Sequence, residues 1–112
     1  MAAENGNCVF CDISAGKTDT DMVFERNGIV AFADIQPSAP IHILIVPKRH
    51  IISVNDLADG DEEMVGKMVL AARDIAHQKN LSGYKLVFNV GREGGQIIDH
   101  LHLHLLSGAG LK

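Results

Sequence analysis

Three histidines alternate with leucines in the segment His100-Leu-His-Leu-His-Leu-Leu106, which carries the clearest chemistry in the chain. In an extended strand, a period of two places every histidine on one face and every leucine on the other, whereas a helix would scatter the imidazoles. Imidazole has a pKa near 6.5, so these side chains could attack an electrophile, transfer protons or bind a metal at neutral pH. The pattern predicts a strand over residues 98–106 with the histidines on its outer face.

One metal ion shared by all three histidines is not expected. Strand residues two apart are separated by roughly 6.8 Å and residues four apart by roughly 13 Å. Zinc–nitrogen bonds are only about 2.0–2.1 Å long. The three imidazoles are therefore expected to divide between different tasks. A histidine-rich exposed strand without a task is the plain alternative.

Two further potential ligands, Cys8 and Cys11, stand in a single Cys-x-x-Cys motif. A thioredoxin-like redox pair is expected beside a βαβ pattern, and no strand pattern precedes this motif. Half of a zinc site, completed by distant histidines, is the better functional interpretation. A reduced pair that merely packs in the core is the alternative.

A glycine-rich loop, Gly91-Arg-Glu-Gly-Gly95, leads with Gln96 directly into the histidine segment. Paired glycines allow close approach to a ligand and can turn successive N–H groups towards a phosphate oxygen, although such pairs are just as often ordinary turns. A phosphate held over a row of imidazoles suggests nucleophilic catalysis. One neutral imidazole would attack phosphorus, a neighbouring histidine would protonate the leaving group, and water would hydrolyse the intermediate.

The elements that must position these residues predict an α+β fold, because several strands joined by tight turns favour an antiparallel sheet. Asn27-Gly28 suits the type I′ turn of a hairpin, and Pro37 and Pro40 bracket a rigid loop. The expected elements are a short helix over 9–15, strands over 21–26, 29–33, 41–46, 84–89 and 98–106, and a long helix from Asp61 to about Lys79. The long helix has a broad apolar arc, which predicts packing on the sheet and on a second subunit; burial in its own core explains the arc equally well.

The chain of 112 residues is expected to form a single domain over residues 1–112, with flexible ends over about 1–7 and 107–112. A net charge of −4 gives no electrostatic footprint for nucleic acid. No apolar run approaches the roughly 20 residues that span a membrane, and the polar, acidic start does not resemble a secretory or mitochondrial signal. We therefore expect a cytoplasmic protein, or one of cytoplasm and nucleus, without a nucleic-acid or membrane partner.

The His-φ-His-φ-His-φ-φ pattern resembles the signature of the histidine triad superfamily of nucleotide hydrolases and transferases. Further motifs are similar to its Hint branch, the histidine triad nucleotide-binding proteins. These motifs are Cys8-x-Phe-Cys-x-Ile13, Ala33-Asp-Ile-x-Pro-x-Ala-Pro40, His42-x-Leu-Ile-Val-Pro-Lys-x-His50, Tyr84 through Asn89 and Gly94-Gly-Gln96. The third histidine, His104, argues against the galactose-1-phosphate uridylyltransferase branch, which carries glutamine there.

The resemblance implies a five-stranded antiparallel sheet with one long and one short helix, paired into a homodimer with a continuous sheet. It also implies hydrolysis of purine nucleoside phosphoramidates through a nucleotidyl-histidine intermediate, with release of AMP or GMP. A nucleotide-binding adaptor with little turnover and a dinucleoside polyphosphate hydrolase are the alternatives.

The resemblance further implies roles for individual residues. Catalysis falls to His102, the nucleophile, with His104, His42 and His100. Nucleotide binding falls to Phe32, Asp34, Ile35, Asn89, Gly95, Gln96, Ile97, His102 and His104. A structural zinc ion falls to Cys8, Cys11, His50 and His100. Ile97 is a departure, because Hint proteins usually place a serine there and an isoleucine cannot donate a proton to the leaving group.

Overall fold

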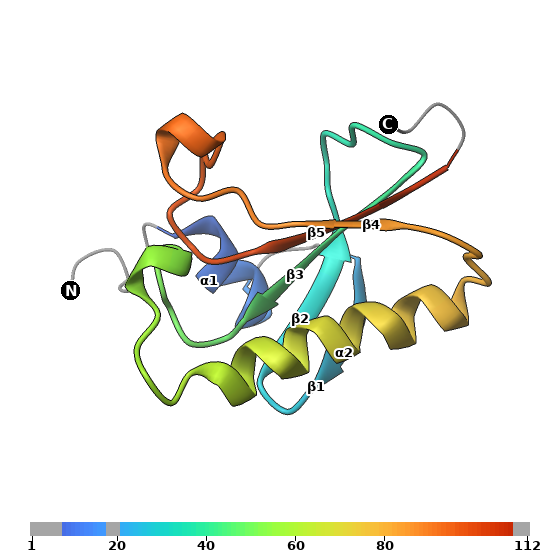
Figure 1. Cartoon of the computed structure of the whole chain (residues 1–112). Helices are drawn as coiled ribbons and strands as arrows, with labels where there is room; N and C mark the ends of the chain where they lie inside the picture. The colour runs from blue at the N-terminus through green and yellow to red at the C-terminus, as the bar shows by residue number, and fades with distance from the viewer. Residues whose placement is uncertain (1–7, 18–20, 109–112) are drawn as a thin grey trace.

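The computed structural model describes residues 8–17 and 21–108. Its elements are α1 (Val9–Ser14), β1 (Met22–Arg26), β2 (Ile29–Ala33), β3 (Ile41–Pro47), η2 (Val54–Asp56), α2 (Glu62–Gln78), β4 (Lys85–Val87), η3 (Arg92–Gly94) and β5 (Leu103–Ser107). The five strands form one sheet in the order β1-β2-β3-β5-β4, and every neighbouring pair is antiparallel. The expected α+β fold, a five-stranded antiparallel sheet with one long and one short helix, is confirmed (Figure 1).

Residue parity in the strands sorts the core into two layers on opposite faces of the sheet. The face under α2 is built from alternate strand residues: Ile29 and Ala31 of β2, Ile43 and Ile45 of β3, and Leu103 and Leu105 of β5, with Met68, Ala71, Ala72 and Ile75 of α2. The opposite face carries Val30, Phe32, Leu44 and Val46, covered by Phe10 and Ile13 of α1. Leu101, Leu103 and Leu105 of the histidine segment thus pack under α2, whereas His104 belongs to the α1 face.

Turn chemistry fixes the local order of the hairpin and of the long helix. Asn27 and Gly28 both adopt positive φ, 56° and 81°, as a type I′ turn requires. Asp61 precedes the first turn of α2, where Glu62 and Glu63 complement the helix dipole. Among the described residues, no helix is long and apolar enough to cross a membrane.

The last strand is shorter at its start than its sequence pattern predicts. β5 begins at Leu103, opposite Ile45 of β3, so His100 and His102 lie in the segment before the strand. The reason is that the chain leaves β3 there: the N–H of Leu101 donates to the carbonyl of Ile51 beyond β3. β4 is likewise shorter than the predicted 84–89, because only Lys85–Val87 pair with β5.

The histidine face is not exposed, which corrects a second expectation. His100 is fully buried and His102 is 7% exposed, because α1 and its flanking residues cover that face of the sheet. The predicted frayed tail is wrong at Ser107, which pairs with Ile41 and donates its hydroxyl to the carbonyl of Gly83. The rest of the predicted ends, 1–7 and 109–112, lies outside the described residues.

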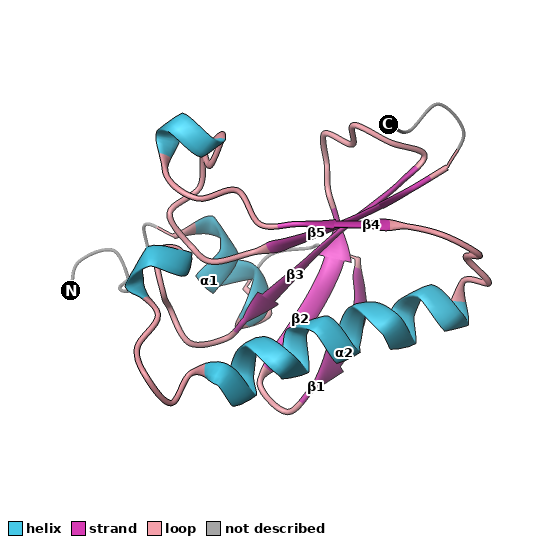
Figure 2. Ribbon diagram, in the orientation of Figure 1, coloured by secondary structure: helices cyan, strands magenta, loops and turns pink. Residues whose placement is uncertain are grey.

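The long connections bring distant segments together at one end of the sheet. Figure 2 shows α1, the β3–α2 connection and the β4–β5 connection gathered there. The hydrogen bond from Gln96 Nε2 to the carbonyl of Ile52 joins the two connections at 2.6 Å. This end of the molecule carries the candidate functional site.

Candidate active site and metal centre

His102 is held in one tautomer by a backbone carbonyl. Its Nδ1 lies 2.6 Å from the carbonyl oxygen of His100, and because a carbonyl only accepts, the hydrogen must be on Nδ1. Burial lowers the pKa of His102, so the ring is neutral at neutral pH and Nε2 keeps its lone pair. The ring of Phe10 on α1 meets this imidazole edge-on, with centroids 5.1 Å apart. The arrangement orients an unprotonated nitrogen that can act as a nucleophile.

His104 forms the centre of a second histidine group. Its Nδ1 lies 2.8 Å from Nε2 of His42, and its Nε2 lies 3.4 Å from Nδ2 of Asn89. Burial, with His102 and His42 beside it, lowers the pKa of His104 to about 4. The ring is thus neutral at neutral pH, next to the ring of His102 at a centroid distance of 4.9 Å.

Asp34 at the end of β2 lies beside this group. One carboxylate oxygen accepts the N–H of Gln36 at 2.9 Å, and the other lies 3.5 Å from Nε2 of His42. The carboxylate is partly exposed at the rim, so it can accept hydrogen bonds from a ligand that carries hydroxyl groups.

A pocket of about 330 Å³ opens over these side chains, a volume in the range of small-molecule sites. Its lining includes the apolar side chains of Val9, Phe10, Ile13, Phe32, Leu44 and Ile98. It also includes Asp34, Asn89, Gly95, His102 and His104, together with Ile97. A lining of both kinds suits a ligand that combines a flat apolar ring with a charged group.

Two isoleucine side chains at the pocket are largely exposed to solvent. Ile35 is 89% exposed and Ile97 is 81% exposed, and both line the cavity. The N–H of Ile97 makes no hydrogen bond within the described part of the chain. It therefore stays available to an anion, although the side chain offers no donor.

The glycine-rich loop does not present its N–H groups as expected. The N–H groups of Gly94 and Gln96 both donate to the carbonyl of Gly91, and that of Gly95 donates to Arg92. These donors are used inside the turn, which the left-handed φ of Gly91 and Gly95, 69° and 91°, makes possible. The expectation that successive glycine N–H groups face a phosphate is corrected.

Gln96 is a structural residue of this loop. Its side chain is 2% exposed, accepts the N–H of Gly91, and donates to the carbonyls of Ile52 and Ile98. It is absent from the residues that line the pocket. The side chain of Gln96 therefore does not face solvent, which was the alternative. Its polar atoms bond to backbone groups and not towards the pocket, where a phosphate contact was expected.

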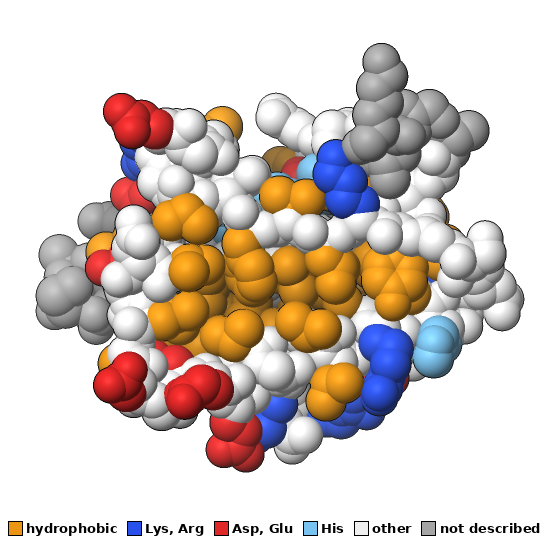
Figure 3. Space-filling model, viewed as in Figure 1, with side chains coloured by type: hydrophobic (Ala, Val, Ile, Leu, Met, Phe, Trp, Pro, Cys, Tyr) orange, Lys and Arg blue, Asp and Glu red, His pale blue; other side chains and the backbone are white. Residues whose placement is uncertain are grey.

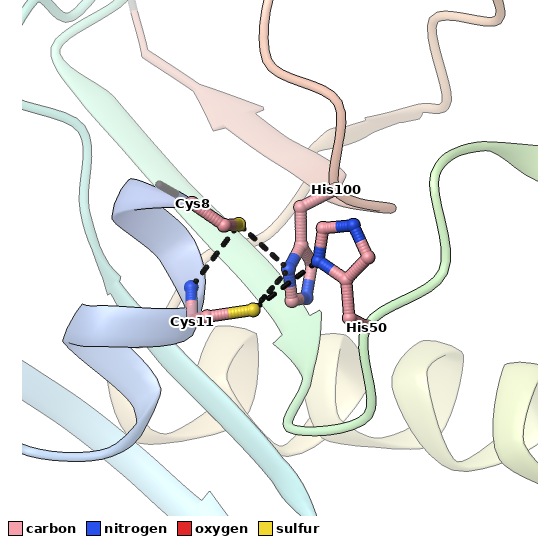
Figure 4. A group of neighbouring side chains, drawn as sticks. All are labelled: Cys8, Cys11, His50 and His100. Atoms are coloured by element: carbon pink, nitrogen blue, oxygen red, sulfur yellow. Dashed lines mark hydrogen bonds between the residues drawn. The ribbon is translucent and has the colours of Figure 1, made fainter. Parts of the chain in front are cut away.

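Cys8, Cys11, His50 and His100 converge at the other side of α1, as Figure 4 shows. Nδ1 of His100 lies 3.2 Å from Sγ of Cys8 and 3.4 Å from Sγ of Cys11, and Nδ1 of His50 lies 3.2 Å from Sγ of Cys11. In a tetrahedral zinc site, sulfur and nitrogen ligands are separated by about 3.5 Å. The four donors therefore fit one zinc-sized ion.

The hydrogen bonds around His100 support the same interpretation. Nε2 of His100 lies 2.8 Å from the carbonyl oxygen of Pro47, so it carries the hydrogen and leaves Nδ1 bare towards the sulfurs. Desolvation of the buried ring lowers its pKa to about 4, which keeps it in the neutral form that binds metals. His100 is absent from the pocket lining, so it supports His102 only through its backbone carbonyl.

Comparison with known proteins matches nearly the whole chain. The family model described as "Scavenger mRNA decapping enzyme C-term binding" matches residues 7–110. Protein HitA of Neisseria gonorrhoeae is 40% identical over 101 residues, which cover 89% of this chain and 94% of that protein. The purine nucleoside phosphoramidase of Escherichia coli (strain K12) is 40% identical over 102 residues, with coverages of 89% and 86%.

Solved structures agree with these matches. A HIT family hydrolase from Legionella pneumophila Philadelphia 1 has a TM-score of 0.91 and 46% identity, covering 95% of this chain and 96% of that chain. A histidine triad protein from Clostridium difficile has a TM-score of 0.92 and 37% identity, with coverages of 96% and 95%. This chain belongs to the histidine triad family. The resemblance of its motifs is thereby confirmed, and two of these relatives are named for a hydrolytic activity, as a purine nucleoside phosphoramidase and as a HIT family hydrolase.

Within this histidine triad fold, the pocket also uses residues that the sequence did not single out. Val9, Phe10 and Ile13 reach the pocket from α1, and Leu44 and Ile98 complete its apolar part. Leu44 could have been found from strand parity, because it pairs directly with His104 across β3 and β5. Phe10 and Ile13 stand in the motif Cys8-x-Phe-Cys-x-Ile13, but the motif does not place them at the pocket, since the docking of a six-residue helix is decided by tertiary packing.

Proposed function

We propose that this histidine triad protein hydrolyses purine nucleoside phosphoramidates through a covalent nucleotidyl intermediate on His102, releasing AMP or GMP. The observation that carries the proposal is the orientation of His102, whose Nδ1 donates to the carbonyl of His100 and whose Nε2 keeps its lone pair. The name of the Escherichia coli relative, purine nucleoside phosphoramidase, supports the substrate class.

The proposed reaction has two displacements at phosphorus. The purine packs against apolar side chains of the pocket lining, and Asp34 accepts hydrogen bonds from the ribose hydroxyls. Nε2 of His102 attacks the α-phosphorus, the phosphorus–nitrogen bond to the amine breaks, and the amine leaves with a proton delivered by His104. A water molecule then gives one proton back to Nε2 of His104 and attacks phosphorus, the bond from phosphorus to Nε2 of His102 breaks, and the nucleotide leaves.

The test is substitution of the proposed nucleophile. We expect His102→Ala to lower AMP release from an adenosine phosphoramidate by at least about a thousandfold, because a covalent route loses its nucleophile. Intact mass measurement under non-acidic denaturing conditions, with a slowly hydrolysed substrate, should show a nucleotidyl adduct on the native chain and none on the variant. His77→Ala, an exposed histidine on α2, serves as the control. Full activity in His102→Ala would refute the proposal.

A nucleotide-binding adaptor is the second candidate, because one observation favours it. Ile97 faces the pocket with a side chain that cannot protonate a leaving group. Tight AMP binding, with negligible turnover of phosphoramidates and of diadenosine polyphosphates, would support the adaptor. Faster turnover of a diadenosine polyphosphate than of the phosphoramidate would instead support a polyphosphate hydrolase.

We also propose that Cys8, Cys11, His50 and His100 bind a structural zinc ion. The convergence of two sulfurs and two Nδ1 atoms supports this assignment, and the distances between them match those of a tetrahedral site. The ion would supply a cross-link between α1, the segment after β3 and the segment before β5. It takes no part in the proposed displacements.

We further propose a homodimer that continues the sheet across β4. β4 is an edge strand and thus has backbone groups open to another strand. Val69 of α2 and Leu86 of β4 are 41% and 37% exposed. Figure 3 displays a strip of hydrophobic side chains running along this face of the molecule. A second copy placed edge to edge would cover the strip and pair the strands.

A further inference from the structure

A second group of potential metal ligands lies in the pocket itself. Ligand atoms of Asp34, His42 and His104 all lie within 4.8 Å of one another. By distance alone this group could hold a divalent cation. The same is true of the cysteine-containing cluster, which consists of Cys8, Cys11, His50 and His100. The hydrogen positions on the two imidazoles decide between a cation site and a chain of hydrogen bonds.

The loop between β2 and β3 fixes the hydrogen of His42. The backbone N–H of Ser38 donates to Nδ1 of His42 at 3.0 Å, with the Ser38 hydroxyl 3.4 Å from the same nitrogen. A backbone N–H cannot accept, so Nδ1 must hold a lone pair. The neutral ring therefore carries its hydrogen on Nε2. His42 is only 8% exposed, so solvent does not compete for that nitrogen.

The hydrogen on His42 in turn fixes that of His104. Nε2 of His42 lies 2.8 Å from Nδ1 of His104, closer than the 3.5 Å to Asp34. Nδ1 of His104 is consequently an acceptor, and the single hydrogen of this neutral ring is on Nε2, at the pocket. Nδ2 of Asn89 lies 3.4 Å from this Nε2, and because two donors do not bond, the assignment requires the Asn89 amide to be turned so that Oδ1 accepts this hydrogen. The low pKa of His104 agrees with a neutral ring.

We propose that the backbone N–H of Ser38 is a positioning group that sets the tautomers of His42 and, through it, His104, so that His104 presents Nε2–H to the substrate. If the proposed function holds, the hydrogen on Nε2 of His104 is the proton that passes to the departing amine. His102 has the opposite tautomer, because its Nδ1–H donates to the carbonyl of His100 and its Nε2 is unprotonated. Two backbone groups of opposite polarity thus prepare one imidazole to attack and the next to donate.

The hydrogen on Nε2 of His42 also opposes metal binding by the group of Asp34, His42 and His104. Coordination through Nε2 of His42 would require its hydrogen to move to Nδ1, where it would face the N–H of Ser38. His100 has the reverse arrangement, because Nε2 donates to Pro47 and Nδ1 stays bare. The structure therefore assigns metal binding to the cysteine-containing cluster and a hydrogen-bond chain to the pocket.

The direct test is the nitrogen spectrum of the ligand-free protein labelled with ¹⁵N-histidine, recorded at neutral pH. We expect protonated Nε2 and unprotonated Nδ1 for His42 and His104, and the reverse for His102. A hydrogen on Nδ1 of His42 or His104, or averaging between the two nitrogens, would overturn the inference. This measurement needs no substitution and no substrate, so it stands even if a variant fails to fold.

Two substitutions at the exposed Ser38 separate its amide from its hydroxyl. Ser38→Pro removes the N–H, whereas Ser38→Ala removes only the hydroxyl. We expect Ser38→Ala to keep the native nitrogen pattern, and Ser38→Pro to lose it and to lower kcat for AMP release about tenfold or more, with little change in KM. A folded Ser38→Pro protein with the native pattern would contradict the inference. The native pattern in a protein that releases no AMP would refute the proposed function instead.

Discussion

His102 and His104 are two residues apart, yet they differ in what holds each ring. His102 donates to a backbone carbonyl, whereas His104 accepts from another imidazole. Both rings are neutral at neutral pH because burial disfavours the imidazolium. At the scale of the residue, function depends on which nitrogen carries the hydrogen, and a neighbouring backbone group or ring determines that.

The lowered pKa values predict activity that persists in mild acid. Protonation of His102 would remove the nucleophilic lone pair, and its pKa lies below the ordinary 6.5. We expect kcat/KM for AMP release to fall in acid with a midpoint below pH 6.5, once spontaneous hydrolysis of the phosphoramidate is subtracted. An acid limb with its midpoint at or above 6.5 would contradict the burial argument.

Stability should depend on pH in the same direction. His104 has a pKa of about 4 in the folded protein and of 6.5 when unperturbed. Between these values the unfolded chain binds more protons, so the free energy of unfolding decreases as the pH falls from 6.5 towards 4. Denaturant unfolding across that range, with a His104→Asn variant as the control, checks this second part of the prediction.

Among the elements, the β4–β5 connection is held by one buried side chain. Gln96 joins Gly91, Ile52 and Ile98 through three hydrogen bonds. Replacement by leucine would leave buried polar groups of the backbone without partners, so we expect Gln96→Leu to lower the free energy of unfolding by about 1–3 kcal/mol. It should also raise KM, because the loop carries Gly95 and Ile97 into the pocket.

Denaturant unfolding and steady-state kinetics measure the two effects. Glu93→Gln, in the same loop but with an exposed side chain, is the matched control. A Gln96→Leu protein with native stability and native KM would show that the loop is held by other contacts.

The short helix α1 is the element that the proposed zinc ion would stabilise most. It has six residues, fewer than an isolated helix needs, and depends on Phe10, Ile13 and the cysteine-containing cluster for its position. We expect the protein purified without chelator to contain about one zinc ion per chain, and the double variant Cys8→Ser with Cys11→Ser to contain none and to melt at lower temperature. Elemental analysis and thermal unfolding measure these outcomes. Ser14→Ala in the same helix should retain the metal; equal metal content in all three proteins would refute the zinc site.

At the scale of the whole molecule, the apolar strip over α2 and β4 predicts self-association. We expect Val69→Glu to shift the protein from dimer to monomer, because a carboxylate would be buried against a second copy. Leu70→Glu is the control, since Leu70 has similar exposure but borders a groove with Phe24 and Arg26 towards β1, away from β4. Concentration-dependent mass measurement distinguishes the two, and a native chain that is monomeric at every concentration would refute the dimer.

The sequence alone determined the elements and the residue types of the site. The period of two in the histidine segment sorted leucines from histidines, the Asn27-Gly28 pair set the hairpin turn, and the apolar arc located α2, because these signals are local and depend on backbone geometry. The family motifs identified the histidines and the cysteine pair. Strand spacing also predicted that the three histidines divide between different tasks.

Only the tertiary structure decided where the hydrogens lie and what covers the site. Burial of the histidine face by α1, the early departure of the chain from β3 at His100 and the inward turn of Gln96 all arise from contacts between segments distant in sequence. The tautomer of His42 depends on a backbone N–H donated by a loop, which no residue type reveals. Hydrogen-bond polarity and desolvation are properties of the packed chain, so they appear only when its segments meet.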